Sequence, residues 1–96
     1  MNILTMDEAH NILRVDGNEL DIEIQALIDA IPPYLEATTG RTWTDGDIIH
    51  PMAKTAAQFI LMLWFNPMDK DIDKLRKAID SLLTALEAVG RSMNNG

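Results

Sequence analysis

The sequence predicts an all-α fold: a four-helix small domain with a short first helix, a kinked second helix, an apolar third helix and a long amphipathic fourth helix. Apolar residues recur at intervals of three and four along most of the chain, which is the spacing of helices that bury one face. Helix-start and helix-stop residues separate these stretches, and 96 residues suit one domain. We therefore expect a single helical domain over residues 1–90 and a flexible tail over residues 91–96.

The first helix is predicted to begin after Thr5. The segment from Thr5 to Glu8 has the form of a capping box, in which the Thr5 hydroxyl and the Glu8 carboxylate each accept from the other residue's amide. Asp16 and Gly17 are expected to end this helix, because glycine readily adopts the left-handed conformation. A helix this short is unstable alone in water, so it must pack on the rest of the domain.

The second helix is expected to have Asn18 as its N-cap and Gly40 as its C-terminal cap. Pro32 and Pro33 interrupt it, and a proline inside a straight helix costs about 3 kcal/mol. Because the apolar phase continues past both prolines, we predict either a kinked helix or two abutting helices. The positions expected on its buried face are Ile24, Leu27, Ile28, Ile31, Leu35 and Thr38.

The connection that follows contains turn residues at 44–47, and Trp43 is expected to fold back onto the core. A small hairpin in this connection is an alternative. His50 and Pro51 open the third helix, since proline is favoured at the first helical position. The segment 59–65 is apolar on all sides, so it is predicted to be either central in the fold or partly buried by another subunit.

The fourth helix is predicted to start near residues 68–71, after Asn66 and Pro67 stop the third, and to end at Gly90. Met52 and Met62 are expected to fill gaps in the core. The apolar stripe of the fourth helix comprises Ile72, Leu75, Ile79, Leu82, Leu83 and Leu86.

Composition excludes several classes of protein. The absence of cysteine rules out a disulfide framework, a thiol nucleophile and a thiolate metal site. The apolar run 59–65 is far shorter than the roughly 20 residues of a membrane span. Fifteen acidic residues against eight basic ones give a net charge of −7, which disfavours a protein that grips nucleic acid.

The charge is also unevenly distributed along the chain. Residues 1–48 hold ten acidic and two basic residues, whereas residues 49–96 hold five acidic and six basic ones. Solvated helix faces are one explanation. The other is that an acidic face of one copy meets a neutral-to-basic face of the next, a head-to-tail contact that closes into rings.

No residue pattern predicts a reaction, a metal site or a cofactor. The segment 69–73 resembles the start of a calcium loop, but Lys74 occupies the sixth position, where the sharp turn needs glycine. His10 and His50 have no second histidine at metal-ligand spacing, so solvated or capping roles are expected for them. We therefore expect no catalytic, metal-binding or cofactor-binding residues and no enzymatic activity.

Three motifs follow one another in a particular order. They are Leu13-Arg14-Val15-Asp16, the stretch from Tyr34 to Gly40-Arg41, and an Ala-rich apolar helix that Pro51 opens and Trp64-Phe65-Asn66-Pro67 ends. Together they resemble the head–tail connector proteins of long-tailed bacteriophages, over a length from about Leu4 to Leu86. Members of that family are small helical proteins that form a ring beneath the portal, join the capsid to the tail and line part of the DNA conduit.

The resemblance implies a non-enzymatic protein of the virion head–tail junction, present in the host cytoplasm during assembly. It implies a homo-oligomeric ring, with the portal protein and tail or stopper proteins as partners and DNA passing through without sequence-specific binding. An acidic helical binding module, or an inhibitor of a basic or DNA-binding partner, is the alternative. A helix-turn-helix regulator is disfavoured, because the only basic cluster, at 70–77, is mixed with acidic residues. The residues expected at the subunit interface are Tyr34, Glu36, Arg41, Phe59, Trp64 and Phe65.

Overall fold

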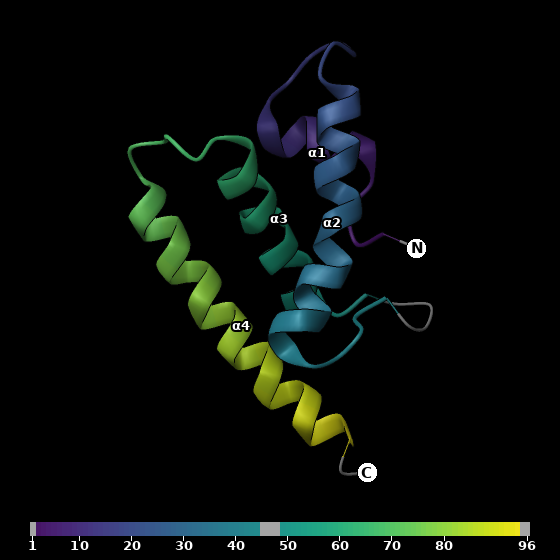
Figure 1. Ribbon diagram of the computed structural model, residues 1–96, viewed down its shortest axis with the longest axis vertical. Helices are drawn as coiled ribbons and strands as arrows, with labels where there is room; N and C mark the ends of the chain where they lie inside the picture. Colours follow the sequence, from purple (N-terminus) through teal and green to yellow (C-terminus); the bar gives the residue numbers. More distant parts are fainter. Residues whose placement is uncertain (1, 45–48, 95–96) are drawn as a thin grey trace.

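The computed structural model describes residues 2–44 and 49–94 and forms four α-helices over these ranges (Figure 1). No strand occurs in either range, so the predicted all-α fold with four helices is confirmed. Apart from Thr44, the turn expected at 44–47 lies outside the described residues. The helices are α1 (Met6–Leu13), α2 (Asp21–Thr39), α3 (Pro51–Phe65) and α4 (Ile72–Asn94).

The third helix is the centre of the fold. α3 packs against each of the other three helices, whereas α1 and α4 make no contact with each other. The molecule measures 45 × 30 × 18 Å, and its thinnest dimension fits two helix layers because packed helix axes lie about 8–10 Å apart. In Figure 1, α2 and α4 diverge from their meeting point, and α3 lies between them. The short α1 does not reach α4, so part of α3 stays uncovered.

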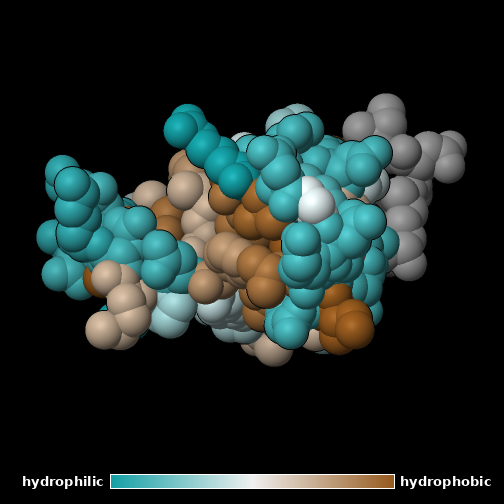
Figure 2. Space-filling view, turned by 90° about the horizontal axis from the view of Figure 1, so that it is seen from above, coloured by the Kyte–Doolittle hydropathy of each residue, from teal (hydrophilic) through white to brown (hydrophobic). Residues whose placement is uncertain are grey.

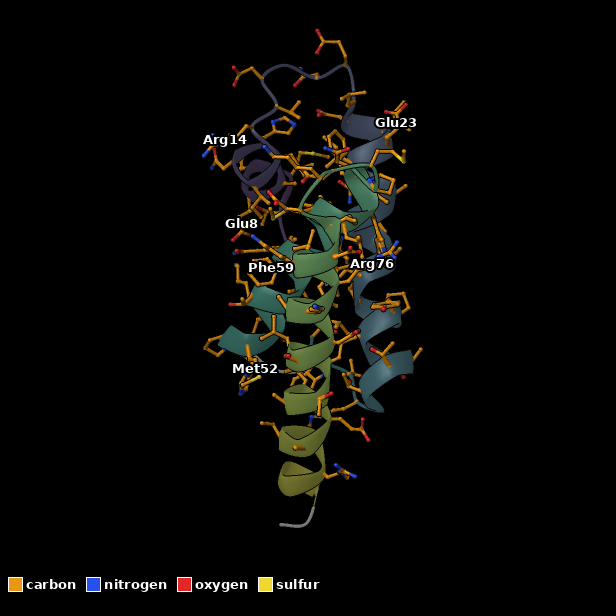
Figure 3. The ribbon with its side chains drawn as sticks, turned by 90° about the vertical axis from the view of Figure 1, so that its left-hand side faces the viewer. Glu8, Arg14, Glu23, Met52, Phe59 and Arg76 are labelled. Carbon is orange, nitrogen blue, oxygen red and sulfur yellow. The ribbon has the colours of Figure 1, made fainter. Side chains whose placement is uncertain are left out.

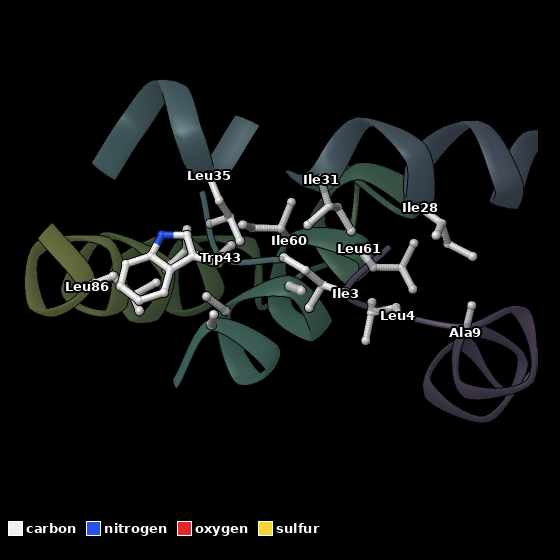
Figure 4. Packing of buried hydrophobic residues seen from close by; sticks show 14 of the residues in the cluster. Ile3, Leu4, Ala9, Ile28, Ile31, Leu35, Trp43, Ile60, Leu61 and Leu86 are labelled. Carbon is white, nitrogen blue, oxygen red and sulfur yellow. The ribbon is translucent and has the colours of Figure 1, made fainter. Parts of the chain in front are cut away.

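The hydrophobic core runs along the inner faces of α2, α3 and α4 and includes the segment before α1 (Figure 4). Burying one large aliphatic side chain contributes about 1.5–3 kcal/mol, so this set supplies much of the stability. Within the apolar segment 59–65, Ile60 and Leu61 are fully buried, which confirms a central position, but Met62 is 38% exposed. The largest fully buried side chains are Ile3, Leu4, Ile24, Ile28, Ile31, Leu35, Ile60, Leu61 and Leu86.

The first helix begins as predicted and ends early. Thr5 and Glu8 form both hydrogen bonds of the capping box, at 2.9 and 3.1 Å. α1 ends at Leu13 because Arg14 adopts the left-handed conformation, with a φ of 56°. The amide of Val15 then donates to the carbonyl of His10 at 3.0 Å, which satisfies a carbonyl of the last turn. The prediction that Asp16 and Gly17 end the helix is therefore wrong, although Gly17 does have a positive φ of 91°.

The second helix begins at Asp21, so the prediction of Asn18 as its N-cap is wrong. The Asn18 carbonyl accepts from the Asp21 amide in a turn, and the first helical hydrogen bond runs from Ile24 to Leu20. α2 contains both Pro32 and Pro33 as one helix, which excludes two abutting helices. Its end at Gly40, with a φ of 80°, is as predicted.

The third helix opens with His50, whose Nδ1 accepts from the Met52 amide at 3.1 Å, and it ends at Phe65, before Asn66. Both ends agree with the prediction. The fourth helix instead continues through Gly90 to Asn94, so the cap at Gly90 and the start of a tail at 91 are wrong. Residues 95 and 96 lie outside the described part.

Gly90 is buried inside α4 because the segment after α2 packs closely on it. A Cβ atom at this position would lie 3.4 Å from Cδ of Arg41 and 3.8 Å from Cζ2 of Trp43. A methyl group here would make ordinary van der Waals contact with both side chains. The glycine therefore reflects tight packing of α4 on the connection, rather than a helix end.

Candidate docking surfaces

Two of the six residues predicted at a subunit interface pack against each other within one chain. The rings of Tyr34 on α2 and Trp64 on α3 meet edge to face, with centroids 5.2 Å apart and an interplanar angle of 80°. Both rings are half-buried. This aromatic pair holds α2 to α3, so its first role is in the fold.

The three aromatic residues of α3 point in different directions. Since each helical residue turns by about 100°, Phe59, Trp64 and Phe65 are separated by roughly 100–140° around the axis. Figure 3 shows Phe59 on the side of α4 opposite to Arg76. Phe65 lies at the far end of α3, where it lines a groove. These three side chains therefore do not share one surface.

The remaining two predicted residues lie near the end of α2. Glu36 is exposed, and the Arg41 guanidinium carbon lies 5.9 Å from the centre of the Trp43 ring. Trp43 is 6% exposed, which confirms that it folds back onto the core, and its ring also meets His50 edge to face at 5.7 Å. The structure brings together Tyr34 and Trp64, but it does not gather all six residues into one site.

An apolar groove lies where α3 is uncovered between α1 and α4. It has two parts of about 180 and 430 Å³, and Met62 and Asp69 line both of them. Figure 2 shows apolar surface at this end of the molecule, between the hydrophilic start of α4 and the hydrophilic surface of α1 and α2. We call it the α3 groove, and its lining residues are Ile12, Leu13, Met62, Phe65, Asn66, Asp69, Asp71, Lys74, Leu75 and Ala78.

A second apolar surface surrounds Ile22 on the first turn of α2. The Ile22 side chain is 86% exposed, although it is a large aliphatic residue. A shallow hollow of about 460 Å³ beside it is lined by residues of α1 and α2. We call this surface the Ile22 patch, and its residues are Met6, Asp21, Ile22, Gln25, Ala26 and Asp29.

Polar contacts fix α1 and the N-terminal segment to their neighbours. Glu8 forms an ion pair with Lys54 on α3. The hydrogen bond from Lys54, and a second one from the Thr5 amide, lower the pKa of Glu8 below its usual value of 4.5. His10 Nε2 donates to Asp21 Oδ1 at 2.7 Å, which joins α1 to the start of α2. The Asn2 amide donates to Asp29 at 2.8 Å and, together with Gln25, lowers the pKa of Asp29.

The cations at the start of α4 have no such partners. Within residues 2–44 and 49–94, Lys70, Lys74, Arg76 and Lys77 make no ion pair, and neither do Glu19 and Glu23 at the other end of the molecule. In Figure 3, Glu23 lies near the start of α2 and Arg76 lies on α4. The start of α4 also carries the exposed acids Asp69, Asp71, Asp73 and Asp80, so its surface has mixed charge.

The geometry offers little for catalysis. A polar hollow of about 650 Å³ lies beside the end of α1, but its His10 is already bonded to Asp21. Among the residues described, no group of three or more histidine, aspartate or glutamate side chains is placed to hold a metal ion. No helix in this part of the chain is long and apolar enough to cross a membrane. What the surface does offer is the α3 groove and the Ile22 patch.

No family model matches this chain, and neither a curated protein nor a solved structure does.

Sequence reasoning located neither the α3 groove nor the Ile22 patch. It assigned Leu75 to the apolar stripe of the fourth helix and Met62 to the core, whereas both line the α3 groove. One signal could have located the groove: α1 is too short to cover the whole length of an apolar helix. The exposure of Ile22 also had a signal: Ile22 is not on the predicted buried face of α2, because it lies about 200° around the helix from Ile24.

Proposed function

We propose that this chain is a head–tail connector protein of a long-tailed bacteriophage or prophage. In this role it forms a ring between the portal and the tail, works at the head–tail junction of the virion and catalyses no reaction. The resemblance of the ordered motifs to that family suggests the identity. The four-helix fold is compatible with it.

The observation that carries the proposal is the presence of two separate apolar surfaces on one small chain. The α3 groove and the Ile22 patch share no residue, and each exposes more apolar than polar surface. Exposed apolar surface of this kind is typical of sites that bind another protein. A ring subunit needs two different contact surfaces, one for each neighbour.

The net charge supports the same role. A ring that surrounds passing DNA must not hold its phosphates, and phosphate binding depends on lysine and arginine side chains. This chain has only eight of them against fifteen acidic residues. A conduit built from such subunits would let DNA pass without sequence-specific binding.

The alternative is an acidic module that binds a basic or DNA-binding partner. Glu19 and Glu23, near the start of α2, favour it, because they are exposed, make no ion pair with another described residue and can complement a basic surface. Native mass spectrometry over a range of protein concentrations, with and without an added basic protein, separates the two proposals. Homo-oligomers that increase with concentration support the connector. A monomer that binds the basic protein tightly supports the alternative.

A further inference from the structure

We propose that α1 (Met6–Leu13) is a flap that opens from α2 and α3 as a unit while the three longer helices stay packed. The chain continues on both sides of the flap, so opening leaves it tied to the rest of the domain. A small apolar contact and the polar contacts of Glu8 and His10 hold it closed. This property of the fold is independent of the connector function.

The flap buries little apolar surface. Ala9 is the one residue of α1 that is fully buried, and its small side chain removes little area from water. Met6, Ile12 and Leu13 are only half-buried, whereas α2 and α3 each bury at least two large aliphatic side chains completely. A helix of eight residues is unstable alone in water, so α1 persists only while it is docked. Opening it should therefore cost less free energy than unfolding the core.

Two polar contacts hold the flap to different helices. Glu8 pairs with Lys54 on α3, and His10 donates to Asp21 at the start of α2, at 2.7 Å. The four side chains are between 22% and 36% exposed, so water competes for both contacts and each contributes modestly. The closed position of α1 thus depends on contacts that a single substitution on another helix can remove.

The chain differs on the two sides of the flap. Ile3 and Leu4, just before α1, are fully buried and anchor the chain to the core. Just after α1, Arg14 has a φ of 56°, a left-handed conformation that costs a residue other than glycine about 1–2 kcal/mol. Because this conformation caps α1, opening and unwinding the helix releases the strain. The anchor before α1 and the strain after it limit the motion to α1 itself.

Opening uncovers a further part of α3. Lys54, Leu61 and Phe65 are spaced by seven and four residues, so they lie along one side of this helix. Lys54 contacts Glu8 of the flap, and Phe65 lines the α3 groove beside the end of α1. Leu61, which lies between them, is fully buried. The flap therefore controls how far the α3 groove extends along this side of α3.

Native-state hydrogen exchange followed by NMR tests the opening directly. The amide protons of residues 10–13 in α1 are compared with those of Ile60 and Leu61 in α3 at low concentrations of urea. The α1 amides should share one opening reaction, and their protection factors should be at least about tenfold lower than those of the two α3 amides. If the α1 amides exchange as slowly as those of Ile60 and Leu61, α1 unfolds only with the rest of the domain and the proposal is wrong.

A substitution on α3 tests what holds the flap closed. Lys54→Gln removes the cation that pairs with Glu8 without changing α1, and it should lower the protection of the α1 amides about two- to fivefold. Arg76→Gln is the matched control: it removes the same charge from α4, where Arg76 is exposed and makes no ion pair with another described residue. It should leave the α1 amides unchanged. Equal protection of α1 in the two variants would overturn the proposed role of the ion pair.

Discussion

The indole Nε1 of Trp43 donates a 2.8 Å hydrogen bond to the Thr39 hydroxyl, which in turn donates to the Leu35 carbonyl at 2.6 Å. Both residues are 6% exposed. This chain of two hydrogen bonds fixes the segment after α2 to the end of that helix. It also places the Trp43 ring against Gly90 of α4, so three elements depend on one buried threonine.

Replacing this threonine by an isosteric apolar residue should destabilise the fold. In Thr39→Val the buried indole N–H loses its acceptor, which should lower the free energy of unfolding by about 1–3 kcal/mol. Urea denaturation measures the difference. Thr38→Val is the matched control, because Thr38 is exposed and its change should stay within about 0.5 kcal/mol. Equal effects of the two substitutions would contradict the role of the buried hydrogen bond.

The position of Gly90 inside α4 predicts the sign of a substitution. Gly90→Ala should raise the free energy of unfolding by about 0.5–1 kcal/mol, because alanine favours the helix and its methyl group fits. Gly90→Leu should lower it by about 1–3 kcal/mol through overpacking against Arg41 and Trp43. Thermal unfolding followed by circular dichroism measures both. If Gly90→Ala lowered the stability, Gly90 would have to adopt the left-handed conformation of a helix cap. Gly40 does adopt it, and alanine there should lower the free energy of unfolding by about 1 kcal/mol.

The Glu8–Lys54 ion pair predicts a pH dependence of stability. Because the pKa of Glu8 is lowered in the folded state, its contribution is present above pH 4.5 and is lost as the pH falls further. Glu8→Gln should weaken this loss on acidification while it keeps the capping box, which glutamine also forms. The effect should stay below about 1 kcal/mol, since both side chains are about one-third exposed and water screens the pair.

Denaturation at pH 7 and at pH 3.5 measures this contribution. Lys54→Gln should remove the same contribution to the free energy of unfolding as Glu8→Gln does. The double variant should be no less stable than either single variant. Fully additive losses would show that the two side chains act separately.

The edge-to-face pair of Tyr34 and Trp64 should appear as a coupling energy. A double-mutant cycle with Tyr34→Ala and Trp64→Ala should give about 0.5–1.5 kcal/mol of interaction between the two rings. Chemical denaturation of the four proteins supplies the cycle. A coupling of zero would mean that the rings stabilise α2 and α3 independently and are available for a partner.

Much of the fold follows from local signals in the sequence. The capping box at Thr5, the proline at the start of α3 and the stop at Asn66 are all confirmed, because each depends on residues within a few positions of one another. The apolar period also located the buried faces of α2 and α4. At the end of α2, however, the buried hydroxyl belongs to Thr39 and not to Thr38, since Thr39 is the residue that meets Trp43.

The wrong predictions concern features that depend on contacts between residues distant in the sequence. The residues next to Gly90 in the sequence predict a helix cap there. Its burial instead depends on Arg41 and Trp43, about fifty residues away in the sequence. In the same way, the exposure of Met62 depends on the gap between α1 and α4, which no local pattern encodes. The candidate site was therefore less predictable than the helices, because it is a property of tertiary packing.

The proposal that this chain is a ring-forming connector is tested most directly by electron microscopy of the chain together with a portal protein. The purified chain is mixed with the portal protein encoded in the same genome, and the complexes are imaged and averaged. We expect a closed ring of this chain stacked on one face of the portal, with a central opening. A portal that stays bare at saturating concentrations of the chain would contradict the connector function.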